Sequence, residues 1–271
     1  MITLLFRSYP LIMAYLRPDC KKKSCIPFSC LDSPSFPVLS CLYPEKSEEI
    51  MMEKNSRPLA LFDFDGTLIK GDSIIAFLRF ARHLKALPGK EYARVLFHSL
   101  RYLCGMETDA QSKNEALRFL KYLSPERKYA LERAFAEEVL LPRVYPEGRE
   151  ALKRLKEAGH ILLLVSASTE NYMQFIAPAL GFDGLLCTAI NENGEIGPNC
   201  KGEEKVKRIR AWLEAEGIEA DFAASHAYGD SKSDLPMLNL CGKGYWVNPP
   251  KSLLKKHPEM QLLSWKSKKN P

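Results

Sequence analysis

The sequence predicts an α/β protein: a three-layer core in which helices cover both faces of a parallel sheet, with an all-helical cap inserted after the first strand. The continuous apolar run 59–62 is typical of a strand buried on both faces. From residue 146 onward, apolar runs alternate with helical patterns, as in a parallel sheet joined by crossover helices. Residues 73–145 carry helical patterns and no strand pattern, which indicates an inserted cap.

These patterns divide the chain into four parts. We expect residues 57–72 and 146–250 to form the core, residues 73–145 the helical cap and residues 251–271 a basic tail. Residues 1–56 contain six prolines and no sustained helical or strand period. We expect this segment to be either a disordered extension or the product of a start codon placed too early, and we leave it out of the predicted fold.

Four helices are expected in the cap. The first is capped by Ser73 and ends before Pro88-Gly89. The second and third cover about 90–103 and 109–123, and the fourth opens at Ser124-Pro125, with proline in its first turn. We expect the cap aromatics to pack inside, apart from a few that face the substrate: Phe77, Phe80, Phe97, Tyr102 and Phe119.

The remaining core elements follow in alternation. Helices are expected at 147–158, 203–216 and 235–240, and strands at 161–165, 185–190, 222–228 and 245–247, the last of these closing the sheet.

The composition excludes several classes of protein. No uninterrupted apolar run reaches the roughly 18 residues of a membrane span, so we expect no transmembrane segment. The net charge of +6 is spread along the chain rather than gathered in a stripe, so we expect no nucleic-acid partner. Eight cysteines without a C-x-x-C pair argue against a zinc site and for a reducing, cytoplasmic setting. We expect the four later cysteines to be buried: Cys104, Cys187, Cys200 and Cys241.

Polar residues follow three of the predicted strands. Asp63 and Asp65 follow the first, Ser166 follows the strand at 161–165, and Asp230 and Asp234 follow the strand at 222–228. Ligands of such sheets bind outside the carboxyl ends of the strands, where these side chains converge. Three acidic or hydroxyl-bearing strand ends are hard to explain as solvated turns.

These residue types match the needs of phosphoryl transfer, in which catalysis is mainly positioning and neutralisation of charge. Asp63 can act as the nucleophile, and Asp65 can protonate the leaving alkoxide and later activate water. Mg²⁺ prefers carboxylate oxygens, which Asp63 and Asp230 can supply. The hydroxyl of Ser166 and the amides of Ser166 and Ala167 can hold the phosphate, helped by a lysine at a helix start.

Three segments carry a family resemblance. Residues 63–68 (DFDGTL), 165–168 (VSAS) and 229–236 (GDSKSDLP) resemble the motifs of haloacid dehalogenase superfamily phosphatases, and most of all their phosphoserine-phosphatase-like subfamily (IB). The resemblance covers about residues 57–250. It implies a Rossmann-like core with a helical cap between the first two motifs, Asp63 as nucleophile, and Asp65 as general acid and base. It also implies Mg²⁺ on Asp63, the Asp65 carbonyl and Asp230, supported by Asp234, with Ser166 on the phosphate.

Two assignments stay open. The lysine of this family corresponds to Lys205 or Lys201, and we favour Lys205 because Ile209 and Trp212 follow it at core-facing helical spacing. Asp72 stands where the phosphoserine enzymes carry an acid that binds the substrate amine, but it could equally be a helix-start acid. Ala116 stands where those enzymes carry a cap arginine, with Arg118 nearby, and Ser233 stands in place of an asparagine; these departures argue against phosphoserine itself.

The predicted function is a Mg²⁺-dependent phosphomonoester hydrolase that acts on a small phosphorylated metabolite through an aspartyl-phosphate. The alternatives are a phosphotransferase with the same intermediate and a catalytically silent protein that binds a phosphorylated ligand. A binder of nucleic acid or membrane surfaces, driven by the basic ends of the chain, is a further rival. The sequence does not indicate the oligomeric state.

Overall fold

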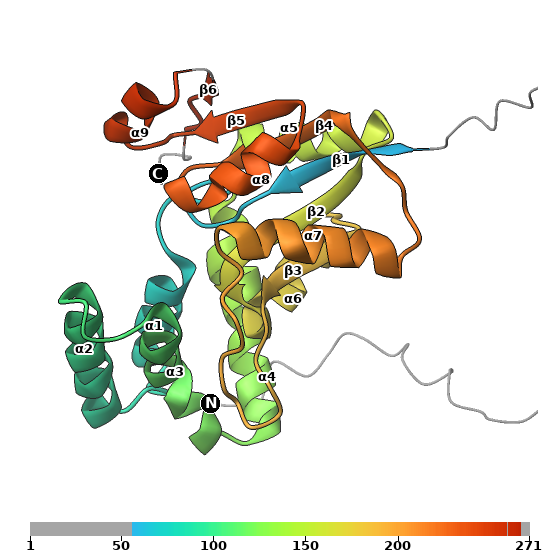
Figure 1. Cartoon of the computed structure of the whole chain (residues 1–271). Helices are drawn as coiled ribbons and strands as arrows, with labels where there is room; N and C mark the ends of the chain where they lie inside the picture. Colours follow the sequence, from blue (N-terminus) through green and yellow to red (C-terminus); the bar gives the residue numbers. More distant parts are fainter. Residues whose placement is uncertain (1–55, 259, 267–271) are drawn as a thin grey trace, which may run out of the picture. The chain divides into compact units, whose positions relative to one another are not determined.

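The computed structural model describes residues 56–258 and 260–266, and the leader predicted at residues 1–56 therefore lies almost wholly outside the described residues. Within them, the strands are β1 (Arg57–Phe62), β2 (Ile161–Thr169), β3 (Gly184–Thr188), β4 (Ala220–Gly229), β5 (Lys243–Val247) and β6 (Gln261–Leu263). They form one parallel sheet of order β3-β2-β1-β4-β5-β6 (Figure 1). The predicted α/β class is confirmed.

Side chains of β1 alternate between two hydrophobic layers. Leu59 and Leu61 belong to a cluster that includes Ile209 of α7 (Glu203–Ala215) and residues of α8 (Leu235–Leu240) and α9 (Lys251–Lys256). Ala60 and Phe62 belong to the other cluster, with residues of α5 (Pro146–Glu157) and α6 (Glu170–Ala179). Because alternate residues of a strand face opposite sides, β1 is buried on both faces, as its continuous apolar run requires.

The strands that follow β1 in the sequence are added on both sides of it. β2 and β3 add to one side of β1, and β4, β5 and β6 add to the other. The strand order therefore reverses between β1 and β4, and the crevice at the carboxyl ends of these two strands is where such sheets bind ligands.

The cap separates β1 from α5. It consists of α1 (Ser73–His83), α2 (Gly89–Leu103), α3 (Asp109–Leu117), a 3-10 turn (Arg118–Tyr122), α4 (Pro125–Ala134), a π-helical turn (Phe135–Leu140) and a 3-10 turn (Leu141–Arg143). In Figure 1, α1, α2 and α3 stand to one side of the sheet. Phe77 and Phe135 pack with ring centroids 5.0 Å apart, and Tyr172 of α6 lies 5.4 Å from Phe77, so the cap interior continues into the core.

Several predicted features differ in the structure. The N-cap of α1 is Asp72, whose carboxylate accepts hydrogen bonds from the backbone of Ile74 and Ile75, whereas Ser73 is the first helical residue. The third cap helix tightens into a 3-10 turn after Leu117. Cys104 is exposed at the end of α2, while the other three described cysteines are buried as expected.

The end of the chain is more ordered than predicted. The strand expected to close the sheet is followed by α9 and then by β6, which pairs with β5. Residues 251–263 are thus part of the core rather than a basic tail. β6 is only three residues long, too short for a period to show in the sequence.

Two observations bear on membranes and surfaces. None of the helices in the described segments is both long and apolar enough to cross a membrane. Of the cap aromatics predicted to pack inside or face the substrate, Phe97 does neither, because it is 58% exposed and does not line the cavity described below.

Candidate active site

The site lies beyond the carboxyl ends of β1 and β4. Asp63 directly follows β1, and its backbone N–H donates to the carbonyl of Tyr228 in β4 at 3.0 Å, which fixes the position of the carboxylate. Lys205 reaches it from the first turn of α7: Nζ lies 2.7 Å from Asp63 Oδ1 and 2.6 Å from Asp234 Oδ1. Both carboxylates and the ammonium are almost wholly removed from solvent.

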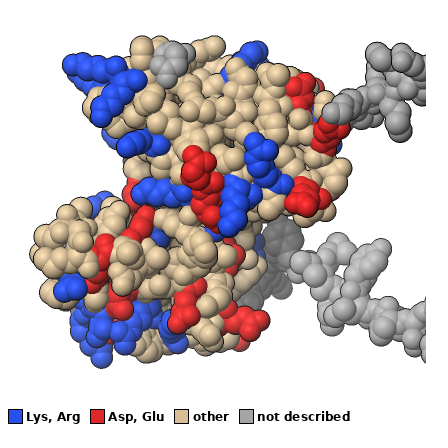
Figure 2. Space-filling model, in the orientation of Figure 1, with Lys and Arg blue, Asp and Glu red and all other residues tan. Residues whose placement is uncertain are grey.

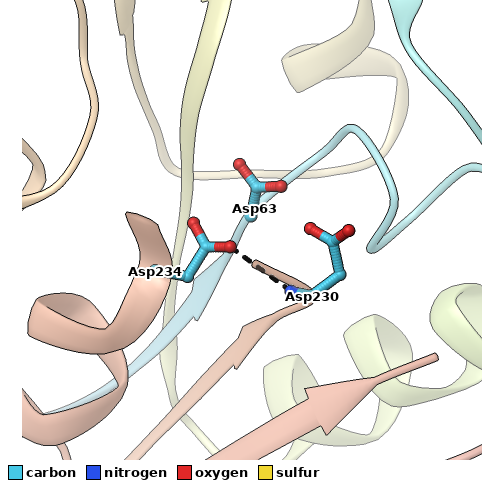
Figure 3. Close-up of side chains that lie close together, drawn as sticks. All are labelled: Asp63, Asp230 and Asp234. Atoms are coloured by element: carbon cyan, nitrogen blue, oxygen red, sulfur yellow. Dashed lines mark hydrogen bonds between the residues drawn. The ribbon is translucent and has the colours of Figure 1, made fainter. Parts of the chain in front are cut away.

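Three carboxylates gather around this lysine. Ligand atoms of Asp63, Asp230 and Asp234 lie within 4.8 Å of one another (Figure 3). Asp234 already uses both of its oxygens, because Oδ1 accepts from Lys205 and Oδ2 accepts from Ser231 Oγ at 2.7 Å and from two backbone amides. By contrast, no hydrogen bond reaches the Asp230 carboxylate from any residue that the structure describes.

The charge balance of the cluster calls for a further cation. Burial raises the pKa of Asp230 to about 8, and the neighbouring carboxylate of Asp63 adds to the shift. Burial also raises the pKa of Asp63 to about 6, against the attraction of Lys205. Although burial alone would lower the pKa of Lys205, the two carboxylates that it touches raise it. Hard carboxylate oxygens around an excess of negative charge fit a divalent cation on Asp63 and Asp230.

Gly66 lets the loop after β1 pass close to Asp230. Its φ is +79°, which disfavours any side chain, and a Cβ atom built there would lie 2.1 Å from Asp230 Oδ2. The loop is closed by the hydrogen bond from the Gly66 N–H to the Gly71 carbonyl at 3.2 Å. Glycine at this position is therefore a condition for placing Asp230 beside Asp63.

Asp65 is held by the cap and by β2 together. Its carboxylate accepts from the backbone N–H of Ser73 at 2.9 Å, from Ser73 Oγ at 2.8 Å and from Ser168 Oγ at 2.5 Å. Burial and the nearby charge of Asp72 raise its pKa to about 7, more than these hydrogen bonds lower it. Asp65 is thus poised to exchange a proton near neutral pH, and its partner Ser73 is the first residue of cap helix α1.

Ser166 and Ala167 lie at the adjacent end of β2. Ser166 is 1% exposed, and its Oγ accepts from the backbone N–H of Ser168 at 3.1 Å. The Ala167 carbonyl accepts from Thr188 Oγ1 at 2.8 Å and from Nζ of cap residue Lys113 at 2.9 Å. These bonds fix the backbone at this end of β2, and both residues line the same cavity as Asp63 and Asp65.

That cavity has a volume of about 1220 Å³ and lies between cap and core. Figure 2 shows the surface hollowed at the left, between the upper and lower parts of the molecule. Its floor is formed by the site residues, and Trp265 closes one side. The cap supplies an apolar wall and several charges, from Ile74, Ile75, Leu78, Tyr102, Leu103, Ala116, Asp109 and Lys113.

The structure places the residues of the two open assignments, Lys205 or Lys201 and Asp72, as follows. Lys205 is buried against Asp63, whereas Lys201 is exposed and lies 3.5 Å from Asp109 of the cap. Asp72 lines the cavity and at the same time caps α1, so its carboxylate serves the helix whether or not it meets a substrate.

The sequence does not predict a role in the site for Ser168 and Lys113, which line the cavity, or for Ser73, which is buried beside Asp65. Ser168 follows Ser166 by two positions in an extended strand, which places both on one side, so this spacing could have revealed it. Ser73, which the sequence predicts as a helix cap, instead donates a hydrogen bond to Asp65. Lys113 has no local signal, since its position depends on how α3 packs against the loop before α7.

Known proteins resemble this chain in sequence and in fold. The family model of haloacid dehalogenase-like hydrolases matches residues 60–239. The chain is 31% identical over 224 residues to a probable phosphatase of Mycobacterium tuberculosis, covering 78% of this chain and 74% of the relative. It is 29% identical over 204 residues to a phosphoserine phosphatase of the same species, covering 70% and 64%. A solved structure of a protein of unknown function from Bordetella pertussis Tohama I has a TM-score of 0.69 at 27% identity, covering 77% of this chain and 98% of that one.

The predicted family resemblance is thereby confirmed, since the matched residues span the strands and helices that place Asp63, Lys205 and Asp230. This chain belongs to the haloacid dehalogenase-like hydrolases.

Proposed function

We propose that the protein is a Mg²⁺-dependent phosphatase that hydrolyses a small phosphomonoester through an aspartyl-phosphate on Asp63. The observation that carries this proposal is Lys205, buried and shared by Asp63 and Asp234, beside the unbonded carboxylate of Asp230. Membership of the hydrolase family and the phosphatase names of the relatives support it. We assign the enzyme to the cytoplasm, in keeping with its free cysteines.

In the first step, an oxygen of Asp63 attacks phosphorus while the bond from phosphorus to the leaving oxygen breaks. Lys205 keeps Asp63 ionised and neutralises charge on the phosphoryl oxygens. Asp65, whose raised pKa keeps much of it protonated near neutral pH, donates its proton to the leaving alkoxide.

In the second step, the Asp65 carboxylate takes a proton from water, and the water oxygen attacks the phosphorus of the aspartyl-phosphate. Inorganic phosphate leaves and the Asp63 carboxylate is restored. Ser166 and the backbone amide of Ala167 hold the phosphoryl group during both steps. Asp234 keeps Lys205 in place.

The residues that would hold Mg²⁺ are Asp63 and Asp230, whose carboxylates lie close together, and the backbone carbonyl of Asp65, as the family resemblance implies. When bound, Mg²⁺ offsets the negative charge that the carboxylates and the phosphoryl oxygens share. Asp230 has no hydrogen-bond donor in the described part of the chain, so it is available for this ligation.

Phosphoserine is not the favoured substrate, although one relative is named for it. Ala116 lines the cavity at the position of the arginine that binds the substrate carboxylate in the phosphoserine enzymes. The Asp72 carboxylate already accepts hydrogen bonds from two backbone amides of α1. The cavity of about 1220 Å³ also exceeds what a leaving group as small as serine fills.

Phosphate release from a panel of phosphomonoesters tests the proposal, with and without Mg²⁺, for the wild type and Asp63→Asn. The panel contains phosphoserine, histidinol phosphate, sugar phosphates, lysophospholipid phosphates and nucleotides. We expect turnover that requires Mg²⁺ and falls by at least about 10³-fold in Asp63→Asn, as loss of a nucleophile does. Turnover that survives in Asp63→Asn contradicts the nucleophile assignment. Transfer to an added alcohol in place of phosphate release identifies a phosphotransferase.

A further inference from the structure

Helix α2 buries Val95 but leaves most of its large apolar residues exposed, while charged residues on its other side pair with acids of the cap. His98 Nδ1 lies 2.8 Å from Glu107 Oε1, and Arg101 Nε lies 2.6 Å from the same oxygen, in the turn before α3. Arg94 lies 3.8 Å from Glu115 of α3. A surface helix normally buries its apolar residues, so the exposure of most of those in α2 is unusual.

The outward side of α2 carries four large apolar residues. Leu96, Phe97, Leu100 and Leu103 are 54%, 58%, 60% and 78% exposed. Their spacing of one, four and seven residues from Leu96 places them on one side of the helix, which we call the α2 apolar face. A contiguous exposed group of this kind marks an interaction site rather than the ordinary scatter of surface apolar residues.

The α2 apolar face leads into the active-site cavity. Leu103 belongs to the face and also lines the cavity, next to Tyr102 from the same helix. Ile75, which is 48% exposed, and Ile74 of α1 extend the apolar wall toward Asp65 and Asp63. An apolar path therefore runs from the outer surface of the cap to the reacting carboxylates.

Basic residues gather at one end of the α2 apolar face. Residues 79–103 contain six Lys or Arg and one acidic residue, Glu91. Those at the start of α2 and the end of α1 are exposed: Arg79, Arg82, Lys85 and Lys90. Figure 2 shows Lys and Arg gathered at the lower end of the cap, beside uncharged surface.

This charge pattern selects among possible occupants. A second copy of the chain, bound face to face, would bring the two basic groups together, which electrostatic repulsion opposes. An anionic lipid surface attracts the same residues by about 1 kcal/mol each. A helix with Leu and Phe on one side and basic residues beside them is typical of a helix that lies in a lipid–water interface.

We propose that the α2 apolar face docks on an anionic lipid surface, and that a phosphomonoester with an apolar chain enters the cavity from there. The docking stands independently of catalysis, whereas the entry of a lipid-borne substrate rests on the proposed phosphatase function.

Flotation of the full chain with vesicles of phosphatidylcholine and phosphatidylglycerol tests the docking. The wild type and Asp63→Asn should bind equally, and Leu96→Gln with Leu100→Gln should weaken binding by about tenfold or more, because two exposed leucines no longer enter the lipid. A matched control carries Tyr122→Gln with Leu262→Gln, which are 64% and 51% exposed outside α2, and should bind as the wild type does. Glutamine keeps the helix intact, and turnover of p-nitrophenyl phosphate verifies the fold.

If the wild-type protein does not float with the vesicles and remains in the vesicle-free fractions, the proposal is overturned. Equal binding by the α2 variant would also overturn it, since the lipid contact would then lie elsewhere in the chain. A wild-type dimer in sedimentation, dissociated by the same two substitutions, would identify a second copy as the occupant instead.

Hydrolysis of lysophosphatidate in these vesicles tests the second part of the proposal, the entry of a lipid-borne substrate into the cavity. The α2 variant should lower kcat/KM for this lipid and leave that for glycerol 3-phosphate unchanged; equal effects on both would overturn lipid entry. Vesicle binding that depends on α2, in a wild type that hydrolyses no phosphomonoester, would refute the phosphatase function and leave the docking standing.

Discussion

Lys205 carries a charge in the protein interior because two carboxylates face it. Its side chain is 1% exposed, and its partners Asp63 and Asp234 follow the neighbouring strands β1 and β4. A buried ion pair of this kind contributes little net stability, but the loss of one partner leaves the other charge without compensation. The lysine therefore has two roles: it compensates the charge of two buried aspartates, and it is the proposed phosphate ligand.

Replacing Lys205 by methionine should lower the free energy of unfolding by about 3–5 kcal/mol at pH 8. The loss should shrink toward pH 5, because protonation of the abandoned aspartates removes their charge, and so stability falls as pH rises. Urea unfolding at the two pH values measures both effects. Lys207→Met, on the same helix but 79% exposed, serves as the control and should change the result by less than about 0.5 kcal/mol.

Asp230→Asn should have opposite effects without and with Mg²⁺. Burial raises the pKa of Asp230 to about 8, so its contribution to stability is complete below about pH 4 and is lost as pH rises toward 8. In EDTA at pH 8 the variant should thus melt at a higher temperature than the wild type. With Mg²⁺ the order should reverse, because binding of the metal stabilises only the chain that retains the ligand. A variant that Mg²⁺ still stabilises as strongly as the wild type would exclude Asp230 as a ligand.

The sequence predicts those site residues whose positions are set by the end of a strand or by the phase of a helix. Asp63, Asp65 and Asp230 follow strands, and Lys205 shares its phase with Ile209, so their meeting could be expected. The contacts of Asp65 with Ser73 and of Lys113 with Ala167 depend on the placement of the cap over the core. No local pattern encodes that placement.

Among the elements, α4 and α6 enclose an acid that the mechanism does not use. Glu132 of α4 is 3% exposed, and Asn171 of α6 donates to its Oε1 at 3.2 Å. Burial raises the pKa of Glu132 to about 7, although Lys128 and Asn171 oppose the shift. The packing of these two helices therefore favours the neutral acid.

Glu132→Gln should stabilise the protein at pH 8, by about 1–3 kcal/mol, and change little at pH 4.5. The sign follows from the raised pKa: the wild-type contribution is complete below about pH 4.5 and is lost as pH rises through about 7. Thermal unfolding across this range measures it, with exposed Glu138→Gln of the π-helical turn as control. A gain that does not vary with pH would point to a cause other than ionisation.

The elements also show where periodicity misleads. The apolar residues of α2 recur at helical spacing, which predicts the helix correctly, but Phe97, which the sequence predicts to pack inside, is exposed, while Val95 two positions earlier is buried. A period identifies a side of a helix; only the neighbours decide whether that side is buried.

In the whole molecule, the last elements complete both the sheet and the cavity. β6 covers the outer edge of β5, and Trp265 packs on Tyr145 and Tyr228 with ring centroids 6.3 and 6.0 Å away. Asn248 exchanges two hydrogen bonds with the backbone of Trp265, at 2.9 and 3.0 Å. The C-terminal segment is thus held on the core by strand pairing, ring packing and hydrogen bonds.

A chain that stops at Asn248 should have a lower Tm and aggregate more readily, because β5 becomes an open edge and the aromatic stack loses its cover. A chain that stops at Lys266 keeps β6 and Trp265 and should match the full protein. Differential scanning calorimetry and light scattering distinguish the two; equal behaviour of both would show that the segment is dispensable.

The position of β1 at the centre of the sheet has a consequence for synthesis. Leu59 pairs with Ile161, and Ala60 pairs with His226, yet a ribosome delivers β1 first and the whole cap before either neighbour. Until then an apolar strand has no partner, and pairing across such distances is slow. Asp63 and Lys205 are 142 residues apart, so translation is nearly complete before the nascent chain contains every part of its active site.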